Sequence, residues 1–545
     1  MKTLNLIALL TAFLLASPAF AKLGNPKAPK TGVFKYNLKQ GPTTLNPLSS
    51  TDYYASIVQS YIIESLLERN VDTYGWEPGL ATKWSTSKNG LEYTFTLRDG
   101  VTWHDGKPVT VEDVKFSYDA VVHPKNKYKT AHSKSYFENI VKCEIIGKNK
   151  VKFTAKKKYF KNFEVAASFL AIVPKHLYEN PTKAQQKKLN KTIIGTGPYM
   201  LDKYKRGKNL TLKANPSWWG SKVSKKKGEN NFKKIQMKFV KDDTKAIQAI
   251  EKGDLDYNSL NAEDYDKKAK GPKWGKDVFK VSVKNKSPVS YGFIGWNLKH
   301  ELFKSRKVRL ALYHLLDRKK MIKKFLNNRS LPATGPLFQQ SLYANKKVKP
   351  VLFDRVKAIK LLASEGWTDS DKDGVLDKVV NGKKKDLSFT IFEPNKDFKK
   401  YLTLYQEDAK KAGVKIIIKV VEWNTFIKKL DERDFEAVRL GWGGGSVDWD
   451  PKQIWHSDSI ANKGSNFISY SNPKVDKLIE KARGTLDRAK RVKVLRKVYK
   501  LIADDVPYAF FFNAKSSFYS HRKRMKRVRD TYAYGIGVGY WWIKK

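Results

Sequence analysis

The chain has 545 residues, of which 41% are hydrophobic and 13% aromatic, so it can bury the cores of several domains. This composition excludes a disordered chain and a fibrous repeat. The 107 Lys and Arg residues far exceed the 53 Asp and Glu residues, and the formal net charge is +54. Such an excess suits a nucleic acid, an anionic surface or an acidic ligand as partner, and it does not define the fold.

The first residues have the pattern of a secretory signal peptide. Lys2 supplies the positive charge, residues 4–15 are apolar but too few to span a bilayer, and Ala19-Phe20-Ala21 is a small-residue cleavage site. We expect cleavage after Ala21 and export to the periplasm, which argues against nucleic acid as the partner. The single cysteine, Cys143, allows no disulfide within the chain, and no cysteine is placed for a lipid anchor.

Alternating aromatic residues predict the first clear strand, in which Tyr93, Phe95 and Leu97 share one face. Two Asp-Gly turn dipeptides bound a second short strand, predicted at residues 101–103. Thr110 is the predicted N-cap of the helix that follows. The aromatic residues of this region are expected in a core and not in a ligand site.

Helices and strands are mixed over the rest of the chain. Apolar residues at helical spacing predict helices at 308–316, 473–482 and 492–502, the second of which opens with Asn472-Pro473. Strands are predicted at 235–240, 387–392 and 414–421. The basic residues of the chain fall largely at helix positions between apolar residues, as in 490–500, and most of them are expected on solvated faces. The fold class is therefore α/β, with α+β mixing, in several domains.

The common catalytic motifs are absent from the sequence. The nearest phosphate-loop pattern, residues 100–107, has five residues between its glycines instead of four and lacks the Ser or Thr that binds magnesium. The chain has no His-Glu-x-x-His zinc helix and no Gly-x-Ser-x-Gly nucleophile turn. We therefore expect a protein that is not an enzyme.

One acidic run resembles a calcium loop. Asp369, Asp371, Asp373 and Asp377 occupy positions 1, 3, 5 and 9 of an EF-hand-type pattern, and Gly374 occupies position 6. The glutamate of position 12 is missing. The alternative is a turn in which the Asp side chains bind their own backbone. If Ca²⁺ binds here, it stiffens a surface hairpin; no cofactor is required.

Several segments together resemble the family 5 bacterial extracellular solute-binding proteins, the oligopeptide- and dipeptide-binding subunits of ABC importers. The resemblance runs in the family's order over residues 40–512. Its segments are LATKWSTSKNGLEYTFTLRDGVTWHDGKPVTVEDVKFSYDAV (80–121), GTGPYML (195–201), NPSWWG (215–220), WNLKHELFKSRKVRLALYHLLDRKKMI (296–322), FDRVKAIKLLASEGWTDSDKDG and SNFISYSNPKVDKLIEKAR.

The resemblance implies a type II-like periplasmic binding protein of cluster C. In this fold two lobes close on a ligand by a hinge motion, and an extra domain is attached. The implied ranges are a signal peptide at 1–21, a discontinuous domain I at 22–68, 193–290 and 513–545, domain II at 69–192, and domain III at 291–512.

The segment 440–459, LGWGGGSVDWDPKQIWHSDS, contains the predicted ligand site. In peptide-binding relatives a Gly-Trp pair is followed closely by an Asp that takes the ligand's α-ammonium group. Three glycines follow Gly441-Trp442 here, so the Asp-aromatic pair fits Asp448-Trp449 if the loop has a short insertion. We predict Asp448 as the ammonium partner, with Asp450 in reserve. The predicted ligand-binding residues are Trp442, Gly443, Gly444, Gly445, Asp448, Trp449 and Asp450.

Each of these residues also has a structural interpretation. Asp450 with Pro451 could cap a helix, Asp448 could end a glycine turn, and both tryptophans could be core residues.

The resulting hypothesis is a monomeric periplasmic receptor that captures di- to oligopeptides and delivers them to an ABC permease. One alternative keeps the fold but binds an oligosaccharide, a nickel complex or an opine. Another, of a different class, is a basic adhesion protein of the cell envelope.

Overall fold

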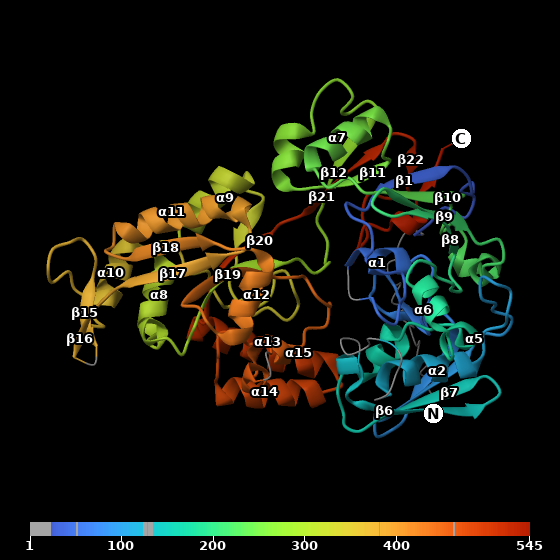
Figure 1. The fold of residues 1–545 in the computed structure, drawn as a ribbon, viewed down its shortest axis with the longest axis horizontal. Coiled ribbons are helices and arrows are strands. Elements are labelled where there is room, and N and C mark those ends of the chain that lie inside the picture. Colours follow the sequence, from blue (N-terminus) through green and yellow to red (C-terminus); the bar gives the residue numbers. More distant parts are fainter. Residues whose placement is uncertain are drawn as a thin grey trace, which may run out of the picture.

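The computed structural model describes residues 23–50, 53–123, 128, 134–380, 382–461 and 464–544. The predicted signal peptide lies outside the described residues. Three large sheets, each with its own hydrophobic core, organise the chain. We call the seven-stranded, four-stranded and six-stranded units domains I, II and III. Domain III occupies one half of the molecule, and domains I and II occupy the other (Figure 1).

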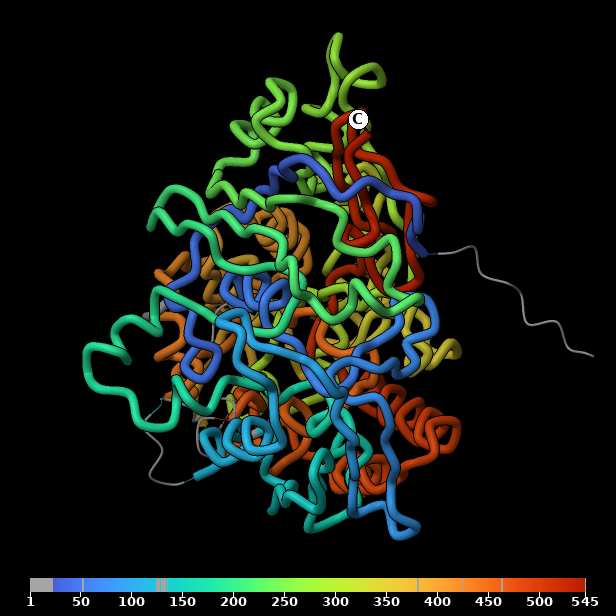
Figure 2. Tube along the Cα trace, turned by 90° about the vertical axis from the view of Figure 1, so that its right-hand side faces the viewer, coloured from blue at the N-terminus to red at the C-terminus, as the bar shows by residue number. Residues whose placement is uncertain are grey.

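Domain I contains the seven-stranded sheet, in the order β12-β21-β11-β1-β10-β9-β8. Strand β1 runs parallel to both β10 and β11. Helices α1 (Tyr53–Gln59) and α7 (Asp243–Lys252) also belong to domain I. Its strands are β1 (Val33–Asn37), β8 (Tyr199–Lys205), β9 (Asn209–Ala214), β10 (Lys234–Lys238), β11 (Tyr257–Leu260), β12 (Val278–Val283) and β21 (Ser517–Arg522). The C-terminal segment lies beside the N-terminal strand (Figure 2), where Arg524 donates to the Val33 carbonyl at 2.9 Å.

Domain II contains a four-stranded antiparallel sheet, in the order β4-β5-β7-β6. Its strands are β4 (Ala81–Thr86), β5 (Glu92–Leu97), β6 (Ile140–Gly147) and β7 (Lys150–Ala155). Its helices are α2 (Val111–Val122), α4 (Asn162–Glu164), α5 (Lys175–Tyr178) and α6 (Lys183–Leu189). A small ladder, β2 (Leu67–Arg69) with β3 (Trp76–Pro78), precedes it.

Domain III contains the six-stranded sheet, in the order β14-β20-β13-β19-β17-β18. Its strands are β13 (Tyr291–Trp296), β14 (Ser330–Pro332), β17 (Ser388–Glu393), β18 (Lys415–Val420), β19 (Ala437–Trp442) and β20 (Tyr508–Ala514). Its helices are α8 (Arg306–His314), α9 (Arg318–Leu326), α10 (Arg355–Ala363), α11 (Lys399–Lys410), α12 (Trp423–Glu432), α13 (Lys452–Trp455), α14 (Pro473–Gly484) and α15 (Arg488–Asp505). The hairpin β15 (Asp377–Val380) with β16 (Lys383–Asp386) projects from its far end (Figure 1).

The predicted strands and helices are confirmed within a few residues, with one exception. Thr110 precedes α2 with a capping box that includes Asp113, and the Asn472 side chain accepts from the Val475 amide at the start of α14. The strand predicted at 101–103 is wrong, because only an isolated bridge between Thr102 and Pro108 forms there. Trp103 instead enters the domain II core, where its indole donates to Asp113.

Two sequence motifs, NPSWWG (215–220) and GTGPYML (195–201), supply contacts that join domains I and II. The Trp218 and Trp219 indoles of the NPSWWG motif donate to the two carboxylate oxygens of Glu64, at 2.9 and 2.7 Å. The Thr196 hydroxyl donates to the same carboxylate at 2.8 Å. A Cβ at Gly195 would lie 1.9 Å from the Ile62 carbonyl oxygen, so only glycine fits at this return of the chain.

Two short segments connect domain I to domain III. Residues 284–290 lead from β12 into β13, and residues 515–516 lead from β20 back into β21. Strand β20 continues to Ala514, beyond the end at 512 predicted for domain III. Beside these crossings, Arg329 of domain III donates to Asp266 of domain I, with Nε to Oδ2 at 2.6 Å. We call the two crossings together the hinge.

Candidate functional site

The glycine-rich loop, residues 443–447, follows the C-terminal end of β19, an inner strand of the domain III sheet, and lies beside the hinge. A Cβ at Gly444 would lie 2.5 Å from the Pro288 carbonyl oxygen of the first crossing, so only glycine allows this close approach. Gly445 has φ of +64°, which favours glycine. Gly443 and Gly445 are exposed, with open space where a side chain would be. The loop therefore presents backbone, not side chains, near the hinge.

Asp448 is buried at the end of this loop, and its carboxylate has internal partners. The Tyr343 hydroxyl donates to Oδ1 at 2.6 Å, and Arg488 Nε donates to the same oxygen at 3.1 Å. Arg491 lies 3.8 Å away. Burial, followed by the Asp448 charge, raises the pKa of Tyr343 to about 12. All three contacts are made to Oδ1, and the role predicted for Asp448 as the ammonium partner stays a prediction.

Asp450 connects domain III to domain II. The Tyr159 hydroxyl of domain II donates to Asp450 at 2.7 Å, and Arg483 of α14 forms an ion pair with the same carboxylate oxygen. The Phe160 amide donates to the Arg483 carbonyl at 3.0 Å. Asp450 also accepts from the amide of Lys452, the first residue of α13, as its helix-capping interpretation requires. We call Tyr159, Asp450 and Arg483 the interdomain clasp.

The two tryptophans of the predicted site belong to the domain III core. Trp442 packs against Phe293 and Phe467, with ring centroids 6.2 and 6.0 Å apart, and it is partly exposed. Trp449 is buried, with its ring centroid 6.4 Å from that of Tyr499. Both surroundings match the interpretation of these tryptophans as core residues, and their contact with a ligand stays a prediction.

Three residues around Asp448 could not be predicted from local sequence patterns. Tyr343 lies far away in the chain, Arg488 lies just before the basic run 490–500, and Arg491 belongs to that run, most of whose basic residues are expected on a solvated face. Arg491 is an exception to the exposure expected for most basic residues of this run, because only 4% of the residue is exposed. Its guanidinium donates to the Thr485 and Leu486 carbonyls, at 2.9 Å each, and lies over the Phe160 ring. These contacts compensate for its burial.

A cavity of about 900 Å³ lies at the hinge. Both crossings line it, together with β14 of domain III and residues 529–533 of domain I. Its basic residues are Lys284, Lys286, Lys515 and Arg529, and its acidic residue is Asp72. The two crossings are the segments that any hinge motion must bend, so a group in this cavity would contact both sides of the hinge.

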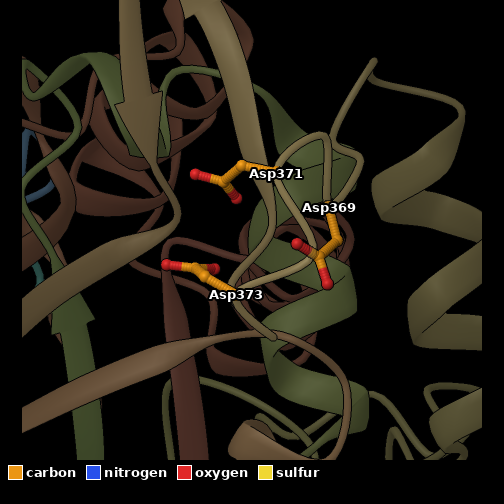
Figure 3. Close-up of side chains that lie close together, drawn as sticks. All are labelled: Asp369, Asp371 and Asp373. Carbon is orange, nitrogen blue, oxygen red and sulfur yellow. The ribbon is translucent and has the colours of Figure 1, made fainter.

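The acidic run of the predicted calcium loop folds as an exposed turn before β15 (Figure 3). Carboxylate oxygens of Asp369, Asp371 and Asp373 all lie within 4.8 Å of one another. Asp377 is turned elsewhere and accepts from the Ser370 hydroxyl at 2.8 Å. Lys384 pairs with Asp371. Three of the four predicted ligands are brought together, and oxygen ligands suit Ca²⁺.

The protein has two lobes joined by a double-crossing hinge, and a loop with exposed backbone and a cavity lie at that hinge. This is the architecture of ligand-binding proteins that close around their ligand. The family model for bacterial extracellular solute-binding proteins, family 5, matches residues 75–465. The chain belongs to this family, whose members are non-enzymatic receptors, and it is an ABC-transport binding protein.

Known relatives are similar to this chain in sequence and structure over nearly its whole length. The oligopeptide-binding protein AppA of Bacillus subtilis is 29% identical over 516 residues, covering 92% of this chain and 90% of its own. The structure of AppA from Bacillus subtilis with a nonapeptide has a TM-score of 0.76 at 28% identity and covers 95% of this chain and 100% of its own. NikZ from Campylobacter jejuni with Ni(L-His) has a TM-score of 0.74 at 26% identity, with coverage of 94% and 99%. Within the described residues, no helix is long and apolar enough to cross a membrane.

Proposed function

We propose that this protein captures peptides between domains I and III and delivers them to an ABC permease in the inner membrane. The observation that carries the proposal is the exposed backbone of the glycine-rich loop. In the described part of the chain, no backbone hydrogen bond to another residue involves Gly444 or Gly445. A peptide presents its own amide and carbonyl groups in an extended form, and it can pair with such a segment by strand addition.

The relatives support a peptide as the ligand. AppA is named for oligopeptides and its structure holds a nonapeptide, whereas NikZ holds a nickel–histidine complex. A cleft that accepts several side chains needs few fixed side-chain contacts, and the glycine loop satisfies that requirement. The proposal includes export through the predicted signal peptide and action as a monomer.

Mass spectrometry of the natively exported protein tests the proposal. The protein is purified from the periplasm without unfolding, and the bound molecules are released and identified. Peptides of defined length support the proposal. Glycans, opines or stoichiometric nickel would contradict it, and an empty cleft with salt-sensitive binding to envelope lipids would favour the adhesion protein. Protein unfolded and refolded in ligand-free buffer is the control for adventitious peptides.

A further inference from the structure

The hinge cavity has an excess of positive charge that its own walls do not neutralise. Asp72, its acidic residue, is buried and already forms an ion pair with Arg529 and accepts from the Ala533 amide at 3.4 Å. Lys515 donates to the Asn328 carbonyl at 2.7 Å. Among the described residues, Lys284 and Lys286 have no ion pair. The cavity therefore keeps the charge of its lysines.

The arrangement of these lysines favours an anion in the cavity. Lys284 and Lys286 are on the first crossing and Lys515 is on the second, so lysines from both connections of the hinge line the cavity. The three lysines are exposed at the wall of this open cavity, and a cleft lined mainly by charges of one sign raises the local concentration of counter-ions. A volume of about 900 Å³ leaves room for a side chain and the water that accompanies it.

We propose that the hinge cavity binds a carboxylate side chain of the ligand, so that this receptor selects acidic peptides. The proposal rests on the proposed function and adds a preference to it. Lys284, Lys286 and Lys515 would hold the carboxylate, while the glycine-rich loop binds the peptide backbone. Leu331 and Gln340 of domain III also line the cavity, so a bound acidic side chain contacts both lobes and stabilises the closed arrangement.

The test compares the wild-type protein with a Lys284→Gln/Lys286→Gln variant. The matched control is Lys270→Gln/Lys276→Gln, which removes the same charge from exposed lysines of domain I outside the cavity. Each protein is freed of ligand and incubated with an equimolar library of peptides of two to nine residues, in which every Glu peptide has a Gln counterpart. The retained peptides are quantified by mass spectrometry at low and at moderate salt.

The expected result is enrichment of Glu peptides over their Gln counterparts by the wild-type protein and by the control. Loss of each cavity lysine should reduce this enrichment roughly two- to five-fold, and salt should weaken it. Equal enrichment in the cavity variant and the control would overturn the inference. Retention of Gln peptides by all three proteins would show that peptide binding itself is intact, so the proposed function is judged independently of the preference for Glu.

A second probe tests the cavity if no peptide is retained, the outcome that defeats the proposed function. Glutarate and its neutral analogue glutaramide are compared by calorimetric titration of the same three proteins. Binding of glutarate, but not glutaramide, to the wild type and control, with loss in the cavity variant, supports an anion site. The same response of all three proteins to glutarate overturns it.

Discussion

Replacement of Asp448 by Asn separates the two interpretations of this residue. The substitution keeps the size and one acceptor oxygen but removes the charge that faces Arg488 and Arg491. Hydrogen bonds to a charged group are worth about 1.5–3 kcal/mol. The Arg488 side chain is 42% exposed, so its share is reduced by solvent to below about 1 kcal/mol. Together with the weakened Tyr343 bond, we expect a loss of about 2–3 kcal/mol of unfolding free energy.

Calorimetry on ligand-free protein measures this loss. For a domain the size of domain III, about 2–3 kcal/mol corresponds to a fall in Tm of roughly 5–10 °C. Asp434→Asn is the matched control, because Asp434 belongs to the same domain and its side chain is 69% exposed in its pair with Lys429. The control should change Tm by less than about 2 °C.

Peptide affinity is measured on the same variants. If Asp448 is a structural residue, the variant loses stability and keeps peptide affinity once its folded fraction is considered. A variant with unchanged Tm and a large loss of affinity would refute this reasoning and establish Asp448 as the ammonium partner.

Three further predictions follow from contacts elsewhere in the molecule. Burial raises the pKa of Glu64 to about 7, from a value near 4.5 in the unfolded chain. The protonated side chain therefore stabilises the fold fully below pH 4.5. This stabilisation is lost as the pH rises to about 7, where the free energy of unfolding should be lower by about 3 kcal/mol. Glu64→Gln should lower stability at low pH, because it mispairs a donor from Trp218, Trp219 or Thr196, and should flatten this pH dependence in chemical unfolding; an unchanged slope would contradict the assignment. Tyr159→Phe removes a hydrogen bond of the interdomain clasp and should give the ligand-free protein a larger radius of gyration in X-ray scattering. The control Tyr136→Phe, at an exposed ring of domain II, should leave the radius unchanged. Equal radii in the wild type and both variants would contradict a role for the clasp. Ca²⁺ at 100 times its Kd should stabilise the protein by about 2.7 kcal/mol if the Asp369 loop binds it, and Asp369→Asn/Asp373→Asn should abolish the effect; absence of titration heat and of any change in Tm would remove the site.

The sequence predicted those elements that local patterns control. Tyr93, Phe95 and Leu97 alternate on a half-buried strand, and Asn472 satisfies amides at a helix start, so both are visible in a few neighbouring residues. The strand predicted at 101–103 does not form, and only an isolated bridge is present there. The partner of the Trp103 indole is the Asp113 carboxylate in the domain II core, which lies ten residues further along the chain. The family motifs, by contrast, identified the class of protein from combinations of residues spread along the whole chain.

The chain by itself therefore determined the class of receptor, the positions of most helices and strands, and the loop that contains the predicted ligand site. Only the tertiary structure decided the partners of the charged groups. Arg491 and Lys286 are both basic residues in polar surroundings of the sequence, yet one is buried against carbonyls and Asp448, and the other lines a cavity whose acid, Asp72, is already paired with Arg529. The energy of a charge depends on its burial and on the groups within a few ångströms. Those groups come from segments that are far apart in the chain and meet only when the domains fold around the hinge.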